Sequence, residues 1–212
     1  MIKKALLLVL LYTSMQSFCQ DFEGVIDYTL SYASLEKDSD ANLEELIALF
    51  GTQSTFITKD GEYKQLSNGQ FLNYLLYKPK TARLYYKDAL DGDTLFYTNV
   101  NAYDNTDFDL RIFKNADTIL GHPCHKLVYK TENVEEHYYF APDLKINPVH
   151  YENHTYANKN KLVALMRSVY LRHEMRINGV LLKMIATEIQ PFNIKDSVFA
   201  PPEDVPKIER NF

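Results

Sequence analysis

The sequence predicts a mainly β fold of the α+β class, with antiparallel strands and one helix near its start. The chain contains 16 Tyr and 12 Phe but only 7 Gly and 8 Pro, and aromatic residues are enriched in strands. Asp-Gly or Asn-Gly pairs at 60–61, 68–69 and 178–179 separate strand-like runs, and such pairs supply the positive φ angles of tight hairpin turns. After Thr52 the apolar residues do not return to helical spacing for about a hundred residues.

The first strand is expected over 22–34. Its residues alternate, so that Phe22, Ile26 and Leu30 share one face while Asp27 points to the other. Such alternation is typical of a strand with one buried face.

A helix is expected over 43–50, where the spacing of the apolar residues changes. Its apolar stripe consists of Leu43, Leu46, Ile47 and Phe50. Ser39 or Asp40 can cap its start and Gly51 can end it. We expect the stripe to pack on the sheet, because such stripes ordinarily face a core.

From residue 54 onward a meander of short strands is expected. These strands span 54–59, 62–66, 71–77, 82–87, 94–100 and 108–114. The run 71–77 is apolar on both faces, so we expect it to be central and covered on each side.

The most definite local pattern lies in 117–148, which predicts a hairpin. Gly121 belongs to its turn, and its strands are expected at 124–131 and 135–140. A further short strand is expected at 144–146.

The last hairpin is expected over 169–190. Its two-residue turn predicts the cross-strand pairs Ile177 with Val180, Met175 with Leu182, His173 with Met184, and Leu171 with Ala186. On the opposite face, Glu174 lies across from Lys183, a pair of opposite charge. The remaining segments are 153–161, which is polar and expected to be a loop, 162–168, which fits a helix or a strand, and 200–212, which is expected to be a surface terminus.

The N-terminus has the layout of a secretory signal peptide. Basic residues at 3–4 precede an apolar block at 5–12, which is shorter than the roughly 20 residues needed to span a bilayer. We expect cleavage after Cys19, which leaves 20–212 as a single domain. The alternative, that Cys19 is the lipidated cysteine of a bacterial lipoprotein, stays open, although Phe18 argues against it.

Charge and cysteine content restrict the class of protein. Without 1–19 the chain has 21 basic and 28 acidic residues, a net charge of −7. Nucleic acid is not an expected partner, because binding it requires a basic patch. Cys124 is then the single cysteine, so stability must come from burial rather than from a disulfide.

Several short segments resemble exported proteins of Bacteroidota. They are Phe22-Glu23-Gly24-Val25-Ile26-Asp27-Tyr28, Ile119-Leu120-Gly121-His122-Pro123-Cys124-His125-Lys126, Ala186-Thr187-Glu188-Ile189 and Phe199-Ala200-Pro201-Pro202. With them the chain resembles the GLPGLI family and related families that have a LolA-like lipoprotein-carrier fold. The resemblance implies a strongly curved antiparallel sheet, an incomplete barrel, with one or two helices on its concave side. It implies no catalytic residues.

Histidines near Cys124 are the strongest candidates for a metal site. On a strand, His122 and Cys124 share one face while His125 points to the other, and His137 returns on the next strand. Without a second cysteine, no metal or other cofactor is expected. The acid pair at 135–136 also diverges on a strand, and the protein is not expected to be an enzyme.

Two functions remain for an exported, non-enzymatic protein. In the first, an apolar ligand such as lipid acyl chains lies in a cavity between sheet and helix, lined by Leu43, Ile47, Phe50, Leu171, Met175, Ile177, Leu182 and Met184. In the second, a filled core presents exposed aromatic residues to an envelope protein, and the candidates are Tyr85, Tyr86, Tyr138 and Tyr139. The expected location is the periplasm or the extracellular space. Peripheral membrane contact and the oligomeric state are left open.

Overall fold

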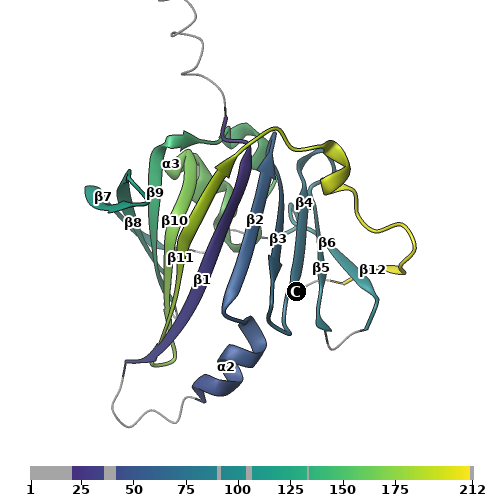
Figure 1. Cartoon of the computed structure of the whole chain (residues 1–212), viewed down its shortest axis with the longest axis horizontal. Coiled ribbons are helices and arrows are strands. Elements are labelled where there is room, and N and C mark those ends of the chain that lie inside the picture. The colour runs from purple at the N-terminus through teal and green to yellow at the C-terminus, as the bar shows by residue number, and fades with distance from the viewer. Residues whose placement is uncertain (1–20, 36–41, 90–91, 104–106, 133, 211–212) are drawn as a thin grey trace, which may run out of the picture.

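In the part of the chain that the structure describes, one sheet of twelve strands forms the body of the protein (Figure 1). The computed structural model describes residues 21–35, 42–89, 92–103, 107–132 and 134–210. The strands are β1 (Gly24–Ser34), β2 (Gln53–Lys59), β3 (Glu62–Ser67), β4 (Tyr74–Lys78), β5 (Arg83–Lys87), β6 (Leu95–Asn99), β7 (Asp109–Ile119), β8 (His122–Lys130), β9 (Glu135–Lys145), β10 (Ser168–Ile177), β11 (Val180–Pro191) and β12 (Lys207–Glu209). Their order in the sheet is β12-β6-β5-β4-β3-β2-β1-β11-β10-β9-β8-β7.

The sheet curves strongly without closing into a barrel, and β7 and β12 are its two edges (Figure 1). The first half of the chain adds strands to one side of β1, whereas the second half starts at the far edge and returns through β11 to the other side of β1. The predicted fold class, mainly β with a curved antiparallel sheet, is confirmed. One exception to the antiparallel pairing is β12, which runs parallel to β6.

Two-residue turns set the register of two hairpins, as the sequence predicts at 60–61 and 178–179. The turn expected at 68–69 is not of this kind, because the longer connection 68–73 joins β3 to β4 and neither Asn68 nor Gly69 has a positive φ. Asp60 and Gly61 have φ angles of 49° and 78°, and Asn178 and Gly179 have φ angles of 47° and 74°. Positive φ at both turn residues matches the twist of the flanking strands. The predicted pairs Ile177 with Val180, Met175 with Leu182, and His173 with Met184 are therefore confirmed.

Several boundaries differ from expectation, among them the end of β7, which continues to Ile119 rather than stopping at 114. β4 begins at Tyr74 rather than at 71, because Leu72 adopts a positive φ of 46° and breaks the strand. β9 continues to Lys145 and absorbs the short strand expected at 144–146. The helix α3 (Lys159–Met166) resolves the ambiguous segment 162–168 and begins inside the expected loop. The expected surface terminus contains β12.

Both faces of the sheet are covered. We call inner the face that packs against 148–166, where Tyr77 contacts Tyr151. This segment comprises the 3₁₀ helices η4 (Pro148–Tyr151) and η5 (Tyr156–Asn158), followed by α3. On the outer face, Leu76 packs with Phe199 of η6 (Asp196–Phe199). Leu76 and Tyr77 are both 0% exposed, so the expectation that this run is central and covered on each side is confirmed.

The helix α2 (Leu43–Phe50) lies beyond the end of β1 (Figure 1). We expected its apolar stripe to pack on the sheet as part of a core, but none of the residues of α2 is buried. The segment 148–166 covers the inner face instead. The helix begins after Asn42, whose side chain accepts a hydrogen bond from the Glu45 backbone nitrogen at 3.1 Å. The expected caps, Ser39 and Asp40, lie outside the described residues.

The predicted signal peptide, 1–19, also lies outside the described residues. Cleavage after Cys19 and the single-domain organisation of 20–212 stay predictions. Among the described residues, no helix is both long and apolar enough to cross a membrane.

Candidate functional site

An open groove of about 450 Å³ lies between α2 and the hairpin of β10 and β11. We call it the α2 groove. It is lined by Tyr32, Asn42, Glu45, Leu46, Leu49, Phe50, Met175, Ile177, Asn178, Val180 and Leu182. Most of these side chains are apolar, so the groove suits a hydrocarbon rather than a charged group.

Local sequence rules place these side chains together. Along the hairpin, strand alternation brings Met175, Ile177 and Leu182 to one face. In α2, helical spacing places Leu46 and Phe50 on one side. The Tyr32 hydroxyl donates a hydrogen bond of 2.6 Å to the Gly51 carbonyl, which ties the end of α2 to β1.

The structure brings together part of the predicted set of cavity residues. Phe50, Met175, Ile177 and Leu182 line the α2 groove. Leu43 and Ile47 lie on α2 outside this lining, and Ile47 is 40% exposed. Leu171 and Met184 belong to a buried core cluster. Sequence reasoning did not assign Tyr32, Leu46 and Leu49 to the site, although Leu46 belongs to the predicted stripe and Tyr32 shares the alternating face of the first strand.

A second space of about 240 Å³ lies under η5 and α3, against the inner face. We call it the inner cavity. It is lined by Phe56, Tyr63, Gln65, Leu72, Leu75, Leu84, Glu136, Tyr138, His154, Tyr156, Ala157, Lys159, Leu162 and Tyr170. Its wall is thus apolar and aromatic, with a few ionisable groups among the rings.

Glu136 is the acidic group of the inner cavity. It accepts hydrogen bonds from the Tyr138 hydroxyl and from His173 Nε2, the latter at 2.8 Å. The His173 ring also stacks on Tyr138 with a centroid distance of 4.4 Å. Burial alone would raise the pKa of Glu136, but hydrogen bonding and charge from His173, with help from Tyr138 and Lys159, hold it below its usual value. Glu136 is therefore ionised at neutral pH.

Lys159 is the basic group of the inner cavity. Its Nζ lies 5.9 Å from the ring centre of Tyr63 and 5.5 Å from that of Tyr170. Although the side chain keeps some accessible surface where it borders the cavity, burial lowers the pKa of Lys159, and the charge of Glu136 opposes this only in part.

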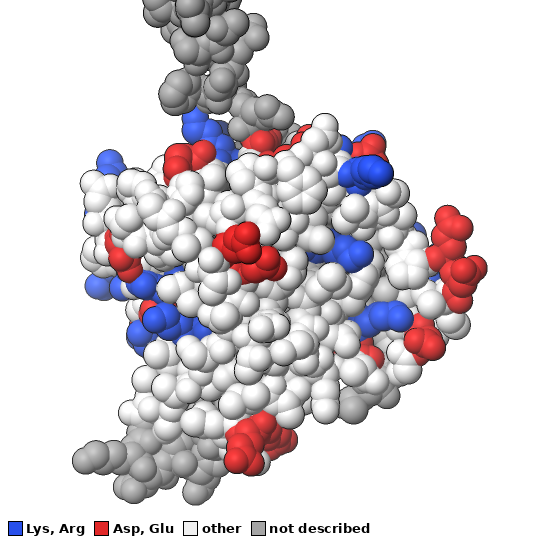
Figure 2. All heavy atoms as spheres, in the orientation of Figure 1, with Lys and Arg blue, Asp and Glu red and all other residues white. Residues whose placement is uncertain are grey.

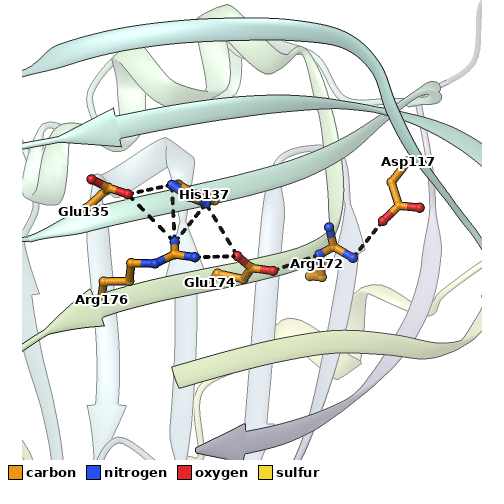
Figure 3. Close-up of polar contacts among 6 residues, drawn as sticks. All are labelled: Asp117, Glu135, His137, Arg172, Glu174 and Arg176. Atoms are coloured by element: carbon orange, nitrogen blue, oxygen red, sulfur yellow. Dashed lines mark hydrogen bonds and ion pairs between the residues drawn. The ribbon is translucent and has the colours of Figure 1, made fainter. Parts of the chain in front are cut away.

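A separate polar network occupies the outer face, where Figure 3 shows six side chains converging from β7, β9 and β10. Its members are Asp117, Glu135, His137, Arg172, Glu174 and Arg176. His137 Nε2 lies 2.8 Å from Glu135, and Arg176 Nη1 donates to His137 Nδ1 at 2.9 Å. Burial, with the charges of Lys126 and Arg176, lowers the pKa of His137. This network joins β10 to its neighbour β9 and, through Arg172 and Asp117, to β7, which is adjacent to neither strand in the sheet.

The residues considered for a metal site are used in other contacts. Cys124 is 0% exposed, and its Sγ lies 3.4 Å from the His122 carbonyl. His122 Nδ1 pairs with Asp143 at 2.6 Å, while His125 Nδ1 accepts from a backbone nitrogen. Among the described residues, no three His, Cys, Asp or Glu side chains are grouped so as to hold a metal ion.

The four tyrosines considered for an exposed interaction surface are all buried. Tyr85, Tyr86, Tyr138 and Tyr139 are each at most 9% exposed. This prediction was wrong because both faces of the sheet are covered. In the view of Figure 2, the surface over β1 and β2 carries few charged side chains, and the basic ones are scattered.

No family model and no curated protein matches the sequence. Among solved structures, the chain is similar to PNGF-II in two crystal forms, with a TM-score of 0.49 in each and identities of 13% and 14%. The first match covers 89% of this chain but 31% of PNGF-II, so the chain spans about a third of that protein's length.

Two further structures cover most of both chains. The Mycobacterium tuberculosis lipoprotein LppX matches with a TM-score of 0.34 and 8% identity over 82% of this chain and 90% of LppX. A LolA superfamily protein from Nitrosomonas europaea matches with a TM-score of 0.39 and 9% identity over 87% of this chain and 92% of its own. The LolA-like resemblance and membership of the GLPGLI family both stay predictions. Because these TM-scores are low, we take the function from the groove and the cavity instead.

Proposed function

We propose that this protein is a non-enzymatic binding protein of the cell envelope that holds the hydrocarbon chain of a lipid in the α2 groove. The observation that carries the proposal is the apolar lining of a groove of about 450 Å³. Small-molecule sites are typically apolar clefts of about 300–1,000 Å³. The groove is within that range.

The energetics favour a hydrocarbon chain. Each methylene moved from water into apolar surroundings contributes about 0.8 kcal/mol. A chain of eight methylenes therefore gains about 6 kcal/mol before the cost of ordering it. Met175 adds an adaptable wall, because an unbranched thioether can fill irregular gaps.

The second function, docking of an envelope protein, is favoured by a different feature. β7 is an edge strand on which Ile112 and Phe113 are 43% and 48% exposed. An exposed edge offers unpaired backbone groups to a strand of another chain. This function does not use the α2 groove, so the two proposals can be separated.

Native mass spectrometry of protein purified from its own envelope, followed by lipid extraction, tests the first proposal. We expect a bound lipid in the wild type and its loss in Ile177→Arg, which places a charge in the groove. Ile112→Arg on β7 is the matched control and should keep the lipid. A ligand-free wild type that takes up no added fatty acid or long-chain alcohol would overturn the proposal.

A further inference from the structure

Lys159 has no hydrogen-bond acceptor among the described residues. It is the first residue of α3, and its side chain lies in the wall of the inner cavity. A lysine ammonium carries three N–H donors. Its ammonium lies over the rings of Tyr63 and Tyr170, which attract the charge but accept no conventional hydrogen bond.

The fold alone gives little reason for a lysine at this position. Moving an ammonium out of water costs free energy unless a partner compensates. A positive charge is also unfavourable at the N-terminal end of a helix dipole, and α3 has no acidic residue in its first turn. The two rings, 5.9 and 5.5 Å from Nζ, offset this cost only in part. An anionic ligand in the cavity would supply the missing partner.

Glu136 leaves the ammonium available for such a ligand. Its carboxylate is engaged by His173 at 2.8 Å and by the Tyr138 hydroxyl. Because these two donors orient the carboxylate, Glu136 influences Lys159 through its charge without closing an ion pair with it.

The inner cavity and the α2 groove adjoin on the inner face of the sheet. Met175, which lines the α2 groove, is the direct cross-strand partner of Glu136, which lines the inner cavity. Directly paired residues of antiparallel strands have Cα atoms about 4.5–5.5 Å apart. An extended ligand that lies over this pair of residues would therefore contact both the groove and the cavity.

We propose that Lys159 binds the carboxylate of a single-chain amphiphile, such as a fatty acid, whose hydrocarbon chain extends toward the α2 groove. This inference rests on the proposed function, because it names the head group of the same ligand. A charge-assisted hydrogen bond from an ammonium to a carboxylate is about twice as strong as a neutral one. The ionised Glu136 nearby disfavours a dianionic phosphate, whereas a monoanionic carboxylate is satisfied by one ammonium.

Calorimetric titration with dodecanoic acid and with 1-dodecanol tests the inference, because the two ligands differ only in the head group. We expect the wild type to bind the acid about tenfold more tightly than the alcohol. Lys159→Met should lose this preference while binding the alcohol as before, and Lys159→Arg should retain it. Lys161→Met is the matched control, since Lys161 is exposed on the same helix.

The outcomes separate this inference from the function on which it rests. Equal affinity of the wild type for acid and alcohol, or an unchanged preference in Lys159→Met, overturns the head-group assignment alone. Failure of the wild type to bind either ligand overturns both proposals. Thermal melting of each variant checks that it is folded. If the melting temperature of Lys159→Met is well below that of the wild type, Lys159→Gln is used in its place.

Discussion

Met175 on β10 and Glu136 on β9 are direct cross-strand partners, although one lines an apolar groove and the other the wall of a partly polar cavity. On the inner face, the apolar lining of the groove and the ionised Glu136 are thus separated by a single pair of adjacent strands. This arrangement suits an amphiphile, whose apolar and polar parts are themselves adjacent.

Tyr32→Phe should weaken the attachment of α2 to the sheet. The hydroxyl donates to the Gly51 carbonyl at 2.6 Å, and its loss should cost about 0.5–1.5 kcal/mol. Hydrogen exchange should then accelerate in Leu43–Phe50 more than in the central strands. Tyr97→Phe, which removes a longer and exposed bond of 3.4 Å to Glu209, is the control. Unchanged exchange in α2 would contradict this role for Tyr32.

Cys124→Ser should destabilise the protein without affecting ligand binding. The thiol is fully buried, and a hydroxyl in its place should cost about 1–3 kcal/mol. Burial also raises the pKa of the Cys124 thiol, which lowers its thiolate fraction. We expect an alkylating reagent to label Cys124 of the native protein no faster than unfolding exposes the thiol. Labelling at the rate of a free cysteine would show that the thiol is accessible.

Local patterns predicted the hairpins because a two-residue turn fixes the register. Glu174 does lie across from Lys183, as expected. Its carboxylate nevertheless pairs with Arg172 and Arg176, at 3.2 and 3.4 Å. These arginines stand two residues away along the same strand and share its face. The register follows from the sequence, whereas the choice among nearby charges depends on side-chain packing.

The coverage of the sheet could not be predicted in the same way. The stripe of α2 indicated a helix correctly but not what the helix contacts, because that depends on the distant segment 148–166. Lys159 lies in the polar segment 153–161, which was expected to be a loop. No helical or strand periodicity there indicates that this side chain faces a cavity. Tyr138 is buried because α3 covers it on the inner face, whereas Tyr139 on the opposite face is covered by the side chains of Arg172 and Lys126 from the adjacent strands.

His154 should make the protein less stable as the pH falls below neutrality. It is 2% exposed, and burial lowers its pKa to about 3, with a smaller effect from the charge of Lys159. In the unfolded chain a histidine has a pKa of about 6.5. The stabilising contribution of neutral His154 is thus present above about pH 6.5 and decreases toward pH 3 by roughly 1.4 kcal/mol per unit.

His154→Phe should remove this dependence, because phenylalanine does not take up a proton. Its ring can replace the imidazole, which lies tilted against Tyr77 at a centroid distance of 4.6 Å. Urea unfolding at pH 7 and at pH 5 should show that the wild type loses about 1–2 kcal/mol more than the variant. His150→Phe controls for the loss of a half-buried histidine outside the cavity. Equal losses in wild type and His154→Phe would mean that His154 is already charged in the folded protein.

Glu174→Gln should destabilise the outer-face network shown in Figure 3. Glu174 lies 3.2 Å from Arg172 and 3.4 Å from both Arg176 and His137. The amide keeps the shape of the side chain but removes the charge between two arginines, so we expect a loss of about 1–3 kcal/mol in the free energy of unfolding. Glu188→Gln, at an exposed position on β11, should change it by less than about 0.5 kcal/mol.

The double variant Glu174→Gln with Arg176→Gln shows whether the loss arises from that pair. In Glu174→Gln the Arg176 guanidinium has lost a carboxylate partner, so removing its charge as well should restore part of the lost stability, with a coupling of about 0.5–3 kcal/mol. The restoration is only partial because Arg176 also contacts His137 and Glu135. The measurement is the midpoint of denaturant unfolding at low and high salt. Since Glu174 is largely shielded from solvent, its contribution should persist when salt screens exposed charges. A contribution that disappears at high salt would place the pair at the solvent surface rather than within the packed face of the sheet.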